Sequence, residues 1–529
     1  MRKKAVTCVL ALSGLILAGI PAVAQTPENE SGGKSAEAKA GTEKPPKEES
    51  SVTEHSIQLN GHAINYKASA GTILLKNEQE EQTALLYYTG YTQTGLSDLS
   101  VRPLVFIYNG GPGGSSAPQH MGAFGPKRVV TVDAQPTPPS PYTLVDNTAG
   151  CLLDAADLVF IDPVGTGFSH AVGKAKDKDF WGIDEDVKSL AQFINTYVSR
   201  NDRWNSPKFL IGESYGTFRN AALANYLQEN DGMDLNGIVM ISTVLDLSTI
   251  SFSPGDDLPY VLYLPSYAAV AWYHNVIPNR SADLGAFLAE ARQFASGEYA
   301  SALLKGSKLG ASERAAVVTK LSHFTGLSED YVSKADLRVN LAQFMAELQR
   351  SRGLITGRLD ARFSGPAFDI LGEYGSYDPM EPAVFGAFVA SFNHYVRDDL
   401  KFGQGQTYRM LNEAAGRQWN WKRSQGHAGG YFPGSPNVED DLVHAMVGNP
   451  HLKVQVENGY FDLATPFFGT EYTMEHLALP EKLRGNIKLE YYDAGHMMYL
   501  HEAALQKLKA NIAGFIRSAS EEAREKSAE

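Results

Sequence analysis

The sequence predicts an α/β fold, with a mostly parallel central sheet flanked by helices. Short apolar strands recur and run into loops rich in glycine and proline, as at 103–111 and 157–169. The stretch 184–198 carries acids in its first turn and an apolar face at helical spacing. That face consists of Val187, Leu190, Phe193, Ile194, Tyr197 and Val198. Since strands and helices alternate along the chain, the strands are expected to be mostly parallel and covered on both faces.

The first predicted elements are two strands joined at Asn60-Gly61, because residues 56–68 alternate between apolar and polar side chains around this turn pair. A helix is predicted at 217–230, directly after a short apolar strand. The other predicted strands are apolar runs within 83–92, 208–212, 235–243, 452–466 and 487–500. Together these elements place the α/β domain at 53–253 and 354–518.

The alternation stops between 254 and 353, where amphipathic segments at 282–295 and 336–350 predict helices. We therefore expect a helical insertion at 254–353 and a C-terminal tail at 519–529. The insertion also contains an aromatic cluster, which either lines a side-chain pocket or forms ordinary core. Its members are Tyr260, Tyr263, Tyr267, Trp272 and Tyr273.

The N-terminal segment 1–24 has the features of a secretory signal peptide. Basic residues at 2–4 precede a short apolar stretch, and small residues at 22–24 suit a signal-peptidase site. A membrane anchor is the alternative, but the apolar stretch is short for a span and ends at Pro21. We expect export to the periplasm, or secretion, with no stable membrane insertion after cleavage. Residues 25–52 are rich in Pro, Gly, Ser, Glu and Lys and predict a disordered linker.

Composition argues against several kinds of partner. The chain has 47 Lys and Arg against 60 Asp and Glu, and no basic block, so nucleic acid is not an expected partner. The glycine loop at 109–116 lacks the lysine of a phosphate cradle, and His496 and His501 miss the i, i+4 spacing of a zinc helix. No cofactor and no metal are expected.

Cys151, the one cysteine beyond the signal segment, is interpreted as a small buried residue. The oligomeric state stays open.

The pattern GESYG at 212–216 predicts a nucleophile. An apolar strand enters it, a helix leaves it, and its outer glycines permit the sharp turn that lifts a serine hydroxyl above a sheet edge. Ser214 is therefore the candidate nucleophile. The alternative is a surface turn in which Ser214 only caps the helix.

A serine nucleophile needs an oxyanion site and a base. The glycine loop 109–116 follows a buried strand and can bring backbone N–H groups close to a substrate oxygen, although an ordinary turn would look similar. Asp462 and His496 each follow a late strand, where active sites of parallel sheets gather. Asp246 is a rival acid because it follows an earlier strand, and Asp462 is preferred because it precedes the histidine strand directly.

Five motifs, taken together and in order, resemble the serine carboxypeptidase family, and more narrowly its bacterial exported branch. They are NGGPGGSS, DPVGTGFS, GESYG, NGYFDLATP and AGHMMYL, and the resemblance spans roughly residues 55–517. It implies an α/β-hydrolase fold with a helical cap insertion over the active site, and release of C-terminal residues from peptides. By motif it implies Ser214 as nucleophile, His496 as base and Asp462 as the acid that orients it. It also implies an oxyanion hole made by the N–H groups of Gly111 and Tyr215.

The same resemblance gives a role to Glu213. It implies that Asn109, Gly110 and Glu213 bind the substrate's terminal carboxylate. A protonated glutamate can donate a hydrogen bond to a carboxylate, and burial raises its pKa. The alternative is an acid that serves only the start of the helix. A second glutamate of the family is replaced around Ala123, so the family's shared-proton glutamate pair is not expected here.

These inferences predict a serine-type carboxypeptidase that acts on peptides with a free C-terminus through an acyl-enzyme. An esterase or acyltransferase using the same three side chains is the alternative. A catalytically silent binding protein with the same fold is less favoured, because all three positions are filled.

Overall fold

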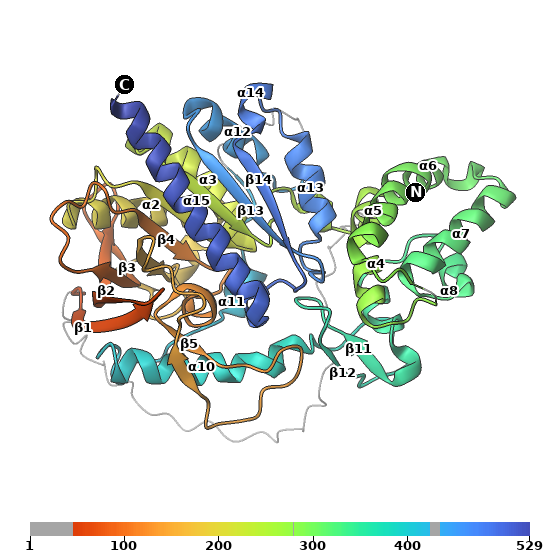
Figure 1. Cartoon of the computed structure of the whole chain (residues 1–529), viewed down its shortest axis with the longest axis horizontal. Coiled ribbons are helices and arrows are strands. Elements are labelled where there is room, and N and C mark those ends of the chain that lie inside the picture. Colours follow the sequence, from red (N-terminus) through yellow and green to blue (C-terminus); the bar gives the residue numbers. More distant parts are fainter. Residues whose placement is uncertain (1–45, 279, 424–433, 529) are drawn as a thin grey trace, which may run out of the picture. The chain divides into compact units, whose positions relative to one another are not determined.

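The computed structural model describes residues 46–278, 280–423 and 434–528 (Figure 1). The predicted signal segment, and the predicted linker up to residue 45, lie outside the described residues. One large sheet has the strand order β1-β2-β3-β7-β4-β9-β10-β13-β14, and β8 pairs with β3. Its strands are β1 (Ser50–Leu59), β2 (His62–Lys76), β3 (Gln82–Gln93), β4 (Leu104–Tyr108), β7 (Asp157–Ile161), β8 (His170–Ala171), β9 (Lys208–Glu213), β10 (Gly237–Ile241), β13 (Lys453–Gly459) and β14 (Ile487–Tyr492).

The first two strands form the predicted antiparallel hairpin, with Asn60 and Gly61 at its turn. The linker prediction is wrong at its end, because Ser50, Ser51 and Val52 already belong to β1 and pair with β2. Glu48 precedes them and accepts a hydrogen bond from the Leu74 backbone at 2.7 Å. Main-chain pairing therefore orders this segment, although its composition has few apolar residues.

The second half of the sheet is parallel from β7 through β4, β9, β10 and β13 to β14. Every residue of β4, β7, β9 and β10 is buried. This is expected of a parallel sheet covered on both faces. Because the strands run the same way, the loops after β4, β9, β10, β13 and β14 meet at one edge of the sheet.

The pleat of the sheet sends alternate side chains to two apolar layers. In β4, Val105 and Ile107 join the layer formed with α10 (Met380–Asp398) and α15 (Glu502–Ala528). Leu104 and Phe106 join the opposite layer, with α2 (Ile183–Arg200), α3 (Tyr215–Asp231) and α12 (Glu439–Gly448). Figure 1 shows α15 crossing one face of the sheet. The predicted α/β architecture is confirmed.

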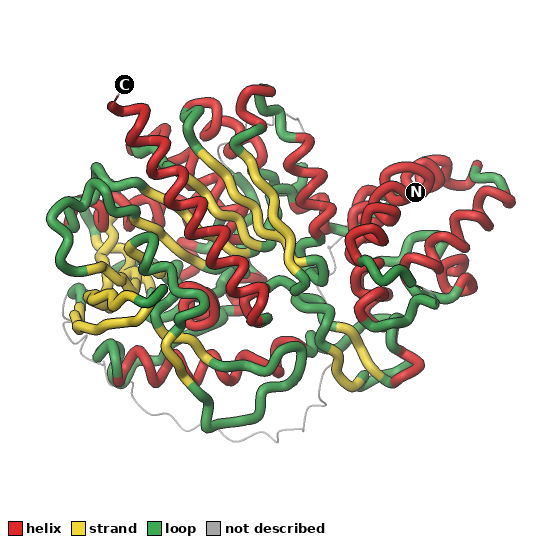
Figure 2. The backbone as a smooth tube through the Cα atoms, in the orientation of Figure 1, coloured by secondary structure: helices red, strands yellow, loops and turns green. Residues whose placement is uncertain are grey.

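The insertion after β10 is helical (Figure 2), and its apolar cluster also includes Phe461, Leu463 and Phe467 from the region after β13. Its helices are α4 (Leu258–Tyr273), α5 (Leu284–Phe294), α6 (Ala300–Lys305), α7 (Ala311–Thr325), α8 (Glu329–Lys334) and α9 (Leu341–Glu347). The helix predicted at 336–350 is too long at both ends, since Asn340 caps α9 in a capping box with Gln343 and the helix ends at Glu347. Tyr263 and Tyr267 are fully buried, and Tyr267 stacks on Phe344 at 4.0 Å between ring centroids. These two aromatic residues form core.

Short elements complete the described chain. They are β5 (Lys127–Val129), β6 (Leu144–Asp146), α1 (Ala117–Gln119), β11 (Leu354–Thr356), β12 (Ser364–Pro366), α11 (Glu413–Arg417), α13 (Phe467–His476) and α14 (Glu481–Arg484). The predicted tail is wrong, because α15 continues through 519–528 and buries Ala519 and Ser520. Cys151 is buried as expected. Within the described ranges, no helix is both apolar enough and long enough to span a bilayer.

Candidate active site

The turn between β9 and α3 holds Ser214 in an unusual backbone conformation. Ser214 has φ 60° and ψ −129°, and its N–H donates to the Ile241 carbonyl at 2.9 Å. A Cβ at Gly212 would lie 2.2 Å from the Gly216 carbonyl oxygen, so the sharpness of this turn requires glycine. A non-glycine residue with such a φ costs on the order of 1–3 kcal/mol, so the surrounding sheet must hold Ser214 in this conformation. Ser214 is partly exposed, whereas its neighbours Glu213 and Tyr215 are buried.

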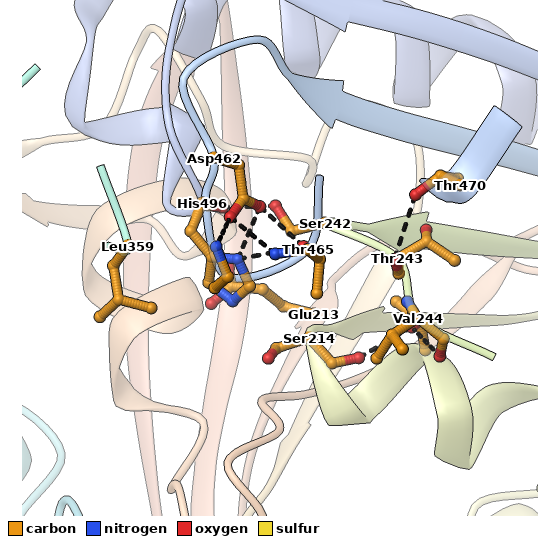
Figure 3. A network of polar contacts seen from close by, with 12 residues as sticks. Glu213, Ser214, Ser242, Thr243, Val244, Leu359, Asp462, Thr465, Thr470 and His496 are labelled. Atoms are coloured by element: carbon orange, nitrogen blue, oxygen red, sulfur yellow. Dashed lines mark hydrogen bonds and ion pairs between the residues drawn. The ribbon is translucent and has the colours of Figure 1, made fainter. Parts of the chain in front are cut away.

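The loops after β13 and β14 bring Asp462 and His496 together. His496 Nδ1 lies 2.7 Å from Asp462 Oδ2. Asp462 is fully buried, and it also accepts hydrogen bonds from the backbone N–H groups of Ala464 and Thr465, at 2.7 and 3.0 Å, and from the Thr465 hydroxyl at 2.7 Å. Burial disfavours a charged imidazole, but the Asp462 carboxylate outweighs it, and the pKa of His496 is raised. Figure 3 shows Ser214, Glu213, Asp462 and His496 gathered at this edge of the sheet.

The backbone of His496 is held from two other directions. Its N–H donates to the Leu359 carbonyl at 2.6 Å, and its carbonyl accepts from the Ser242 hydroxyl at 2.7 Å. The neighbouring Arg358 carbonyl accepts from the N–H of Leu463 at 3.0 Å. The segment that follows the cap thus contacts both the loop of the candidate base and the loop of the candidate acid.

The rival acid Asp246 is used elsewhere. Its two carboxylate oxygens accept from the backbone N–H and the hydroxyl of Ser248, at 2.8 and 2.7 Å. Asp246 thereby caps the short helical turn 247–250. His496 has Asp462 as its carboxylate partner, and this agrees with the order of preference that the sequence indicated.

The glycine loop after β4 packs directly against the serine turn. A Cβ at Gly110 would lie 2.4 Å from the backbone nitrogen of Tyr215, so no larger residue fits there. Gly111 is the next residue, with φ 107°. Within the described part of the chain, the N–H groups of Gly111 and Tyr215 make no hydrogen bond. Two free backbone donors beside the candidate nucleophile are what an oxyanion hole needs.

Glu213 and Asn109 meet beside Ser214. The Asn109 amide donates to Glu213 Oε1 at 2.8 Å, and both side chains are buried. Burial raises the pKa of Glu213 to about 7. Its second oxygen, Oε2, has no hydrogen-bond partner among the described residues. The neighbouring Tyr499 hydroxyl is also buried without one. The protonated form of Glu213 is therefore accessible near neutral pH, with its second oxygen unused.

A buried ion pair holds the loop that carries Asn109. Arg219 of α3 is fully buried and pairs with Asp186 of α2, with Nε 2.6 Å from Oδ2. Its Nη1 donates to the Asn109 carbonyl at 2.7 Å. The guanidinium also lies over the rings of Tyr108 and Tyr215, 5.0 and 5.1 Å from their centroids. Arg219 thus ties the end of β4 to the start of α3.

Sequence reasoning missed several of these supporting residues. Thr465 had a local signal, because an aspartate followed by a turn often accepts from the backbone two and three residues on. Ser242, Leu359 and Arg219 come from segments far from their partners in the sequence and carried no such signal. Among the described residues, no group of three His, Cys, Asp or Glu side chains could hold a metal ion.

Comparison with known proteins finds a similarity for part of the chain. Residues 60–284 match the family model described as serine carboxypeptidase. This segment is therefore similar to the serine carboxypeptidase family. It includes the glycine loop, the serine turn, Asn109 and Glu213, whereas Asp462 and His496 lie beyond the matched residues.

Two curated relatives of the family match over shorter stretches. Serine carboxypeptidase-like 45 of Arabidopsis thaliana is 28% identical over 211 residues, which are 38% of this chain and 42% of the relative. The human retinoid-inducible serine carboxypeptidase is 31% identical over 135 residues, which are 25% of this chain and 26% of the relative. The chain thus aligns with less than half the length of these relatives.

A solved structure matches over most of the chain. It is that of Kex1(Δp), a prohormone-processing carboxypeptidase from Saccharomyces cerevisiae, with a TM-score of 0.55 and 17% sequence identity. The match covers 86% of this chain and 92% of the Kex1 chain. At this identity the likeness establishes the α/β-hydrolase fold that the motifs implied.

Proposed function

We propose that the protein is a serine-type carboxypeptidase that releases C-terminal amino acids from peptides. One observation carries the proposal. The residue before the candidate nucleophile is a buried glutamate with a pKa raised to about 7, and it is hydrogen-bonded to Asn109. A carboxyl group that can be neutral at this position suits a substrate that ends in a free carboxylate.

The proposed chemistry proceeds through an acyl-enzyme. Asp462 orients His496 through Nδ1, which leaves Nε2 to take the proton from the Ser214 hydroxyl as it attacks the last peptide carbonyl. The N–H groups of Gly111 and Tyr215 stabilise the resulting oxyanion. His496 then gives the proton to the leaving amine, and the released product is the C-terminal amino acid. Water, activated by the same imidazole, hydrolyses the acyl-enzyme and restores Ser214.

The proposed carboxylate site explains why cleavage occurs at the chain end. Protonated Glu213 donates to one oxygen of the substrate carboxylate, and Asn109 and the N–H of Gly110 supply further donors. An ionised Glu213 would instead place two negative charges side by side in a partly dry site, at a cost of several kcal/mol. A neutral ester or amide end gains nothing from this arrangement.

The division of the chain and its location are part of the proposal. We assign catalysis to 50–253 and 354–528, with 254–353 as the cap. The basic start, apolar stretch and small residues of 1–24 support a signal peptide. They also support an exported, periplasmic or secreted enzyme of the bacterial branch of the family. The expected substrates are peptides with a free C-terminus.

The test compares two substrates that differ only at the terminus. The purified protein is incubated with an N-blocked dipeptide and with its C-terminal amide, and amino-acid release is followed. Release from the free acid but little from the amide supports a carboxypeptidase. Hydrolysis of simple esters with neither peptide cut would instead support an esterase, and transfer of the acyl group to an added alcohol would support an acyltransferase. Ser214→Ala serves as the blank in every assay.

A further inference from the structure

Tyr499 presents a hydroxyl group to the same site, and the mechanism above does not use it. Its side chain is about 2% exposed, and the hydroxyl has no hydrogen-bond partner among the described residues. It lies beside the carboxyl of Glu213 and the amide of Asn109. Glu213 Oε2, in the same place, is also buried without a partner. Two unpaired polar atoms therefore lie together next to the candidate nucleophile.

Buried polar groups are rarely left unpaired, because each such group gives up its hydrogen bonds to water. The groups that face Glu213 are Asn109, Tyr499, His496 and Asp462. Asn109 is bonded to the other oxygen of Glu213, and His496 and Asp462 are bonded to each other. What remains is one neutral hydroxyl and one carboxyl that can be protonated. Both can donate, and although they face each other, neither has a partner at hydrogen-bonding geometry among the described residues.

We propose that Tyr499 is a binding residue for the C-terminal carboxylate of the substrate. Its hydroxyl donates to one carboxylate oxygen while protonated Glu213 donates to the other. A carboxylate offers only acceptors, so it satisfies both donors at once. In the free enzyme the same hydroxyl faces the Glu213 carboxyl. This inference rests on the proposed carboxypeptidase function and adds a specificity-determining residue to it.

The surroundings of Tyr499 hold its hydroxyl in position before substrate arrives. A Cβ at Gly122 would lie 2.7 Å from the tyrosine ring and 3.0 Å from the ring of Phe388, so the ring is closely packed at this point. Tyr499 also follows His496 by three residues, in the short helical turn Met498–Leu500. Burial raises the pKa of Tyr499 well above its usual value, so the side chain stays a neutral donor.

Tyr499→Phe removes this hydroxyl and keeps the ring. We expect kcat/KM for the N-blocked free-acid dipeptide to fall about 10- to 100-fold, mainly through KM, as for a lost hydrogen bond to a charged group. The corresponding ester, which lacks the carboxylate, should be turned over within about twofold of the wild-type rate. Tyr267→Phe is the matched control, because Tyr267 is buried in the cap and its hydroxyl also has no partner among the described residues. This control should leave both substrates unchanged.

A second readout separates binding from a structural role. Calorimetry on Ser214→Ala and on Ser214→Ala/Tyr499→Phe should show weaker binding of the free-acid dipeptide to the double variant, and equal binding of the dipeptide amide. Equal losses for free acid and ester in Tyr499→Phe would assign the residue to folding and overturn the inference. Undiminished preference for the free acid would overturn it as well, while the carboxypeptidase function stood. A wild-type enzyme that does not prefer the free acid would refute the proposed function, and the inference with it.

Discussion

The Asn109 amide donates a hydrogen bond to the Glu213 carboxyl at 2.8 Å, and this bond joins the loop after β4 to the residue that precedes Ser214. Both side chains are buried, and the Asn109 carbonyl accepts a hydrogen bond from Arg219. A titratable group is thus fixed one residue away from the candidate nucleophile.

The first prediction concerns the nucleophile. Ser214→Ala should lower kcat by roughly 10⁴-fold or more, because the residual rate comes from binding and oxyanion contacts alone. The melting temperature should not fall, since the Ser214 hydroxyl does not hold the turn. A fluorophosphonate probe should label the wild-type protein at Ser214 and leave the variant unlabelled, as read by peptide mass spectrometry. Peptidase activity that survives in Ser214→Ala would exclude the serine mechanism.

The second prediction compares the two acids. Asp462→Asn should lower kcat by roughly 10³- to 10⁴-fold, because His496 loses the partner that sets its tautomer. Asp246→Asn is the matched control and should cost far less, since Asp246 bonds to Ser248 rather than to His496. Steady-state kinetics on one peptide measures both variants. A larger loss in Asp246→Asn would mean that a different carboxylate orients the base.

The third prediction concerns pH. Glu213 must be protonated to bind the substrate carboxylate, and its pKa is about 7, so kcat/KM for a free-acid peptide should fall as pH rises through about 7. His496 must be neutral, and this gives the acid limb. His496, Asp462, Tyr499 and Asn109 all face Glu213, so the two observed pKa values belong to the coupled group.

Glu213→Gln separates the limbs of this profile. Glutamine keeps a donor and cannot ionise, so the alkaline limb should flatten. The acid limb should persist and move to lower pH, because the Glu213 charge that raises the pKa of His496 is gone. Ester substrates, which lack the terminal carboxylate, should show little alkaline loss even in the wild type. Paired pH–rate profiles on one free-acid peptide provide the measurement. An alkaline limb that is the same in both proteins would show that Glu213 does not bind the C-terminal carboxylate of the substrate.

The fourth prediction concerns stability. Arg219→Met leaves Asp186 buried and unpaired, and it should lower the free energy of unfolding by about 3–5 kcal/mol. Arg417→Met removes an exposed partner of Glu413 and should change it by less than about 1 kcal/mol. Urea unfolding followed by circular dichroism compares the two. If Arg219→Met/Asp186→Leu is no more stable than Arg219→Met, the unpaired carboxylate is not the source of the loss.

Much of the fold could be predicted because its signals are local. The hairpin turn at Asn60-Gly61, the apolar face of α2 and the glycines around Ser214 each reflect neighbouring residues. The predicted element boundaries are wrong where packing between distant segments decides whether a residue joins a strand or a helix. The strand at 50–52 exists because β2 lies beside it, and α15 extends through 519–528 because Ala519 and Ser520 are buried against the domain.

The sequence by itself determined the candidate nucleophile, base and acid, because motif, strand position and chain order limit each to one or two residues. Only the tertiary structure decided that Asp462 rather than Asp246 bonds to His496, that Arg219 holds the loop of Asn109, and that Tyr499 lies beside Glu213. The physical reason is distance along the chain. These hydrogen bonds, and the burial that raises the pKa of Glu213, depend on groups from separate loops. The groups meet only when the parallel strands align their carboxyl ends.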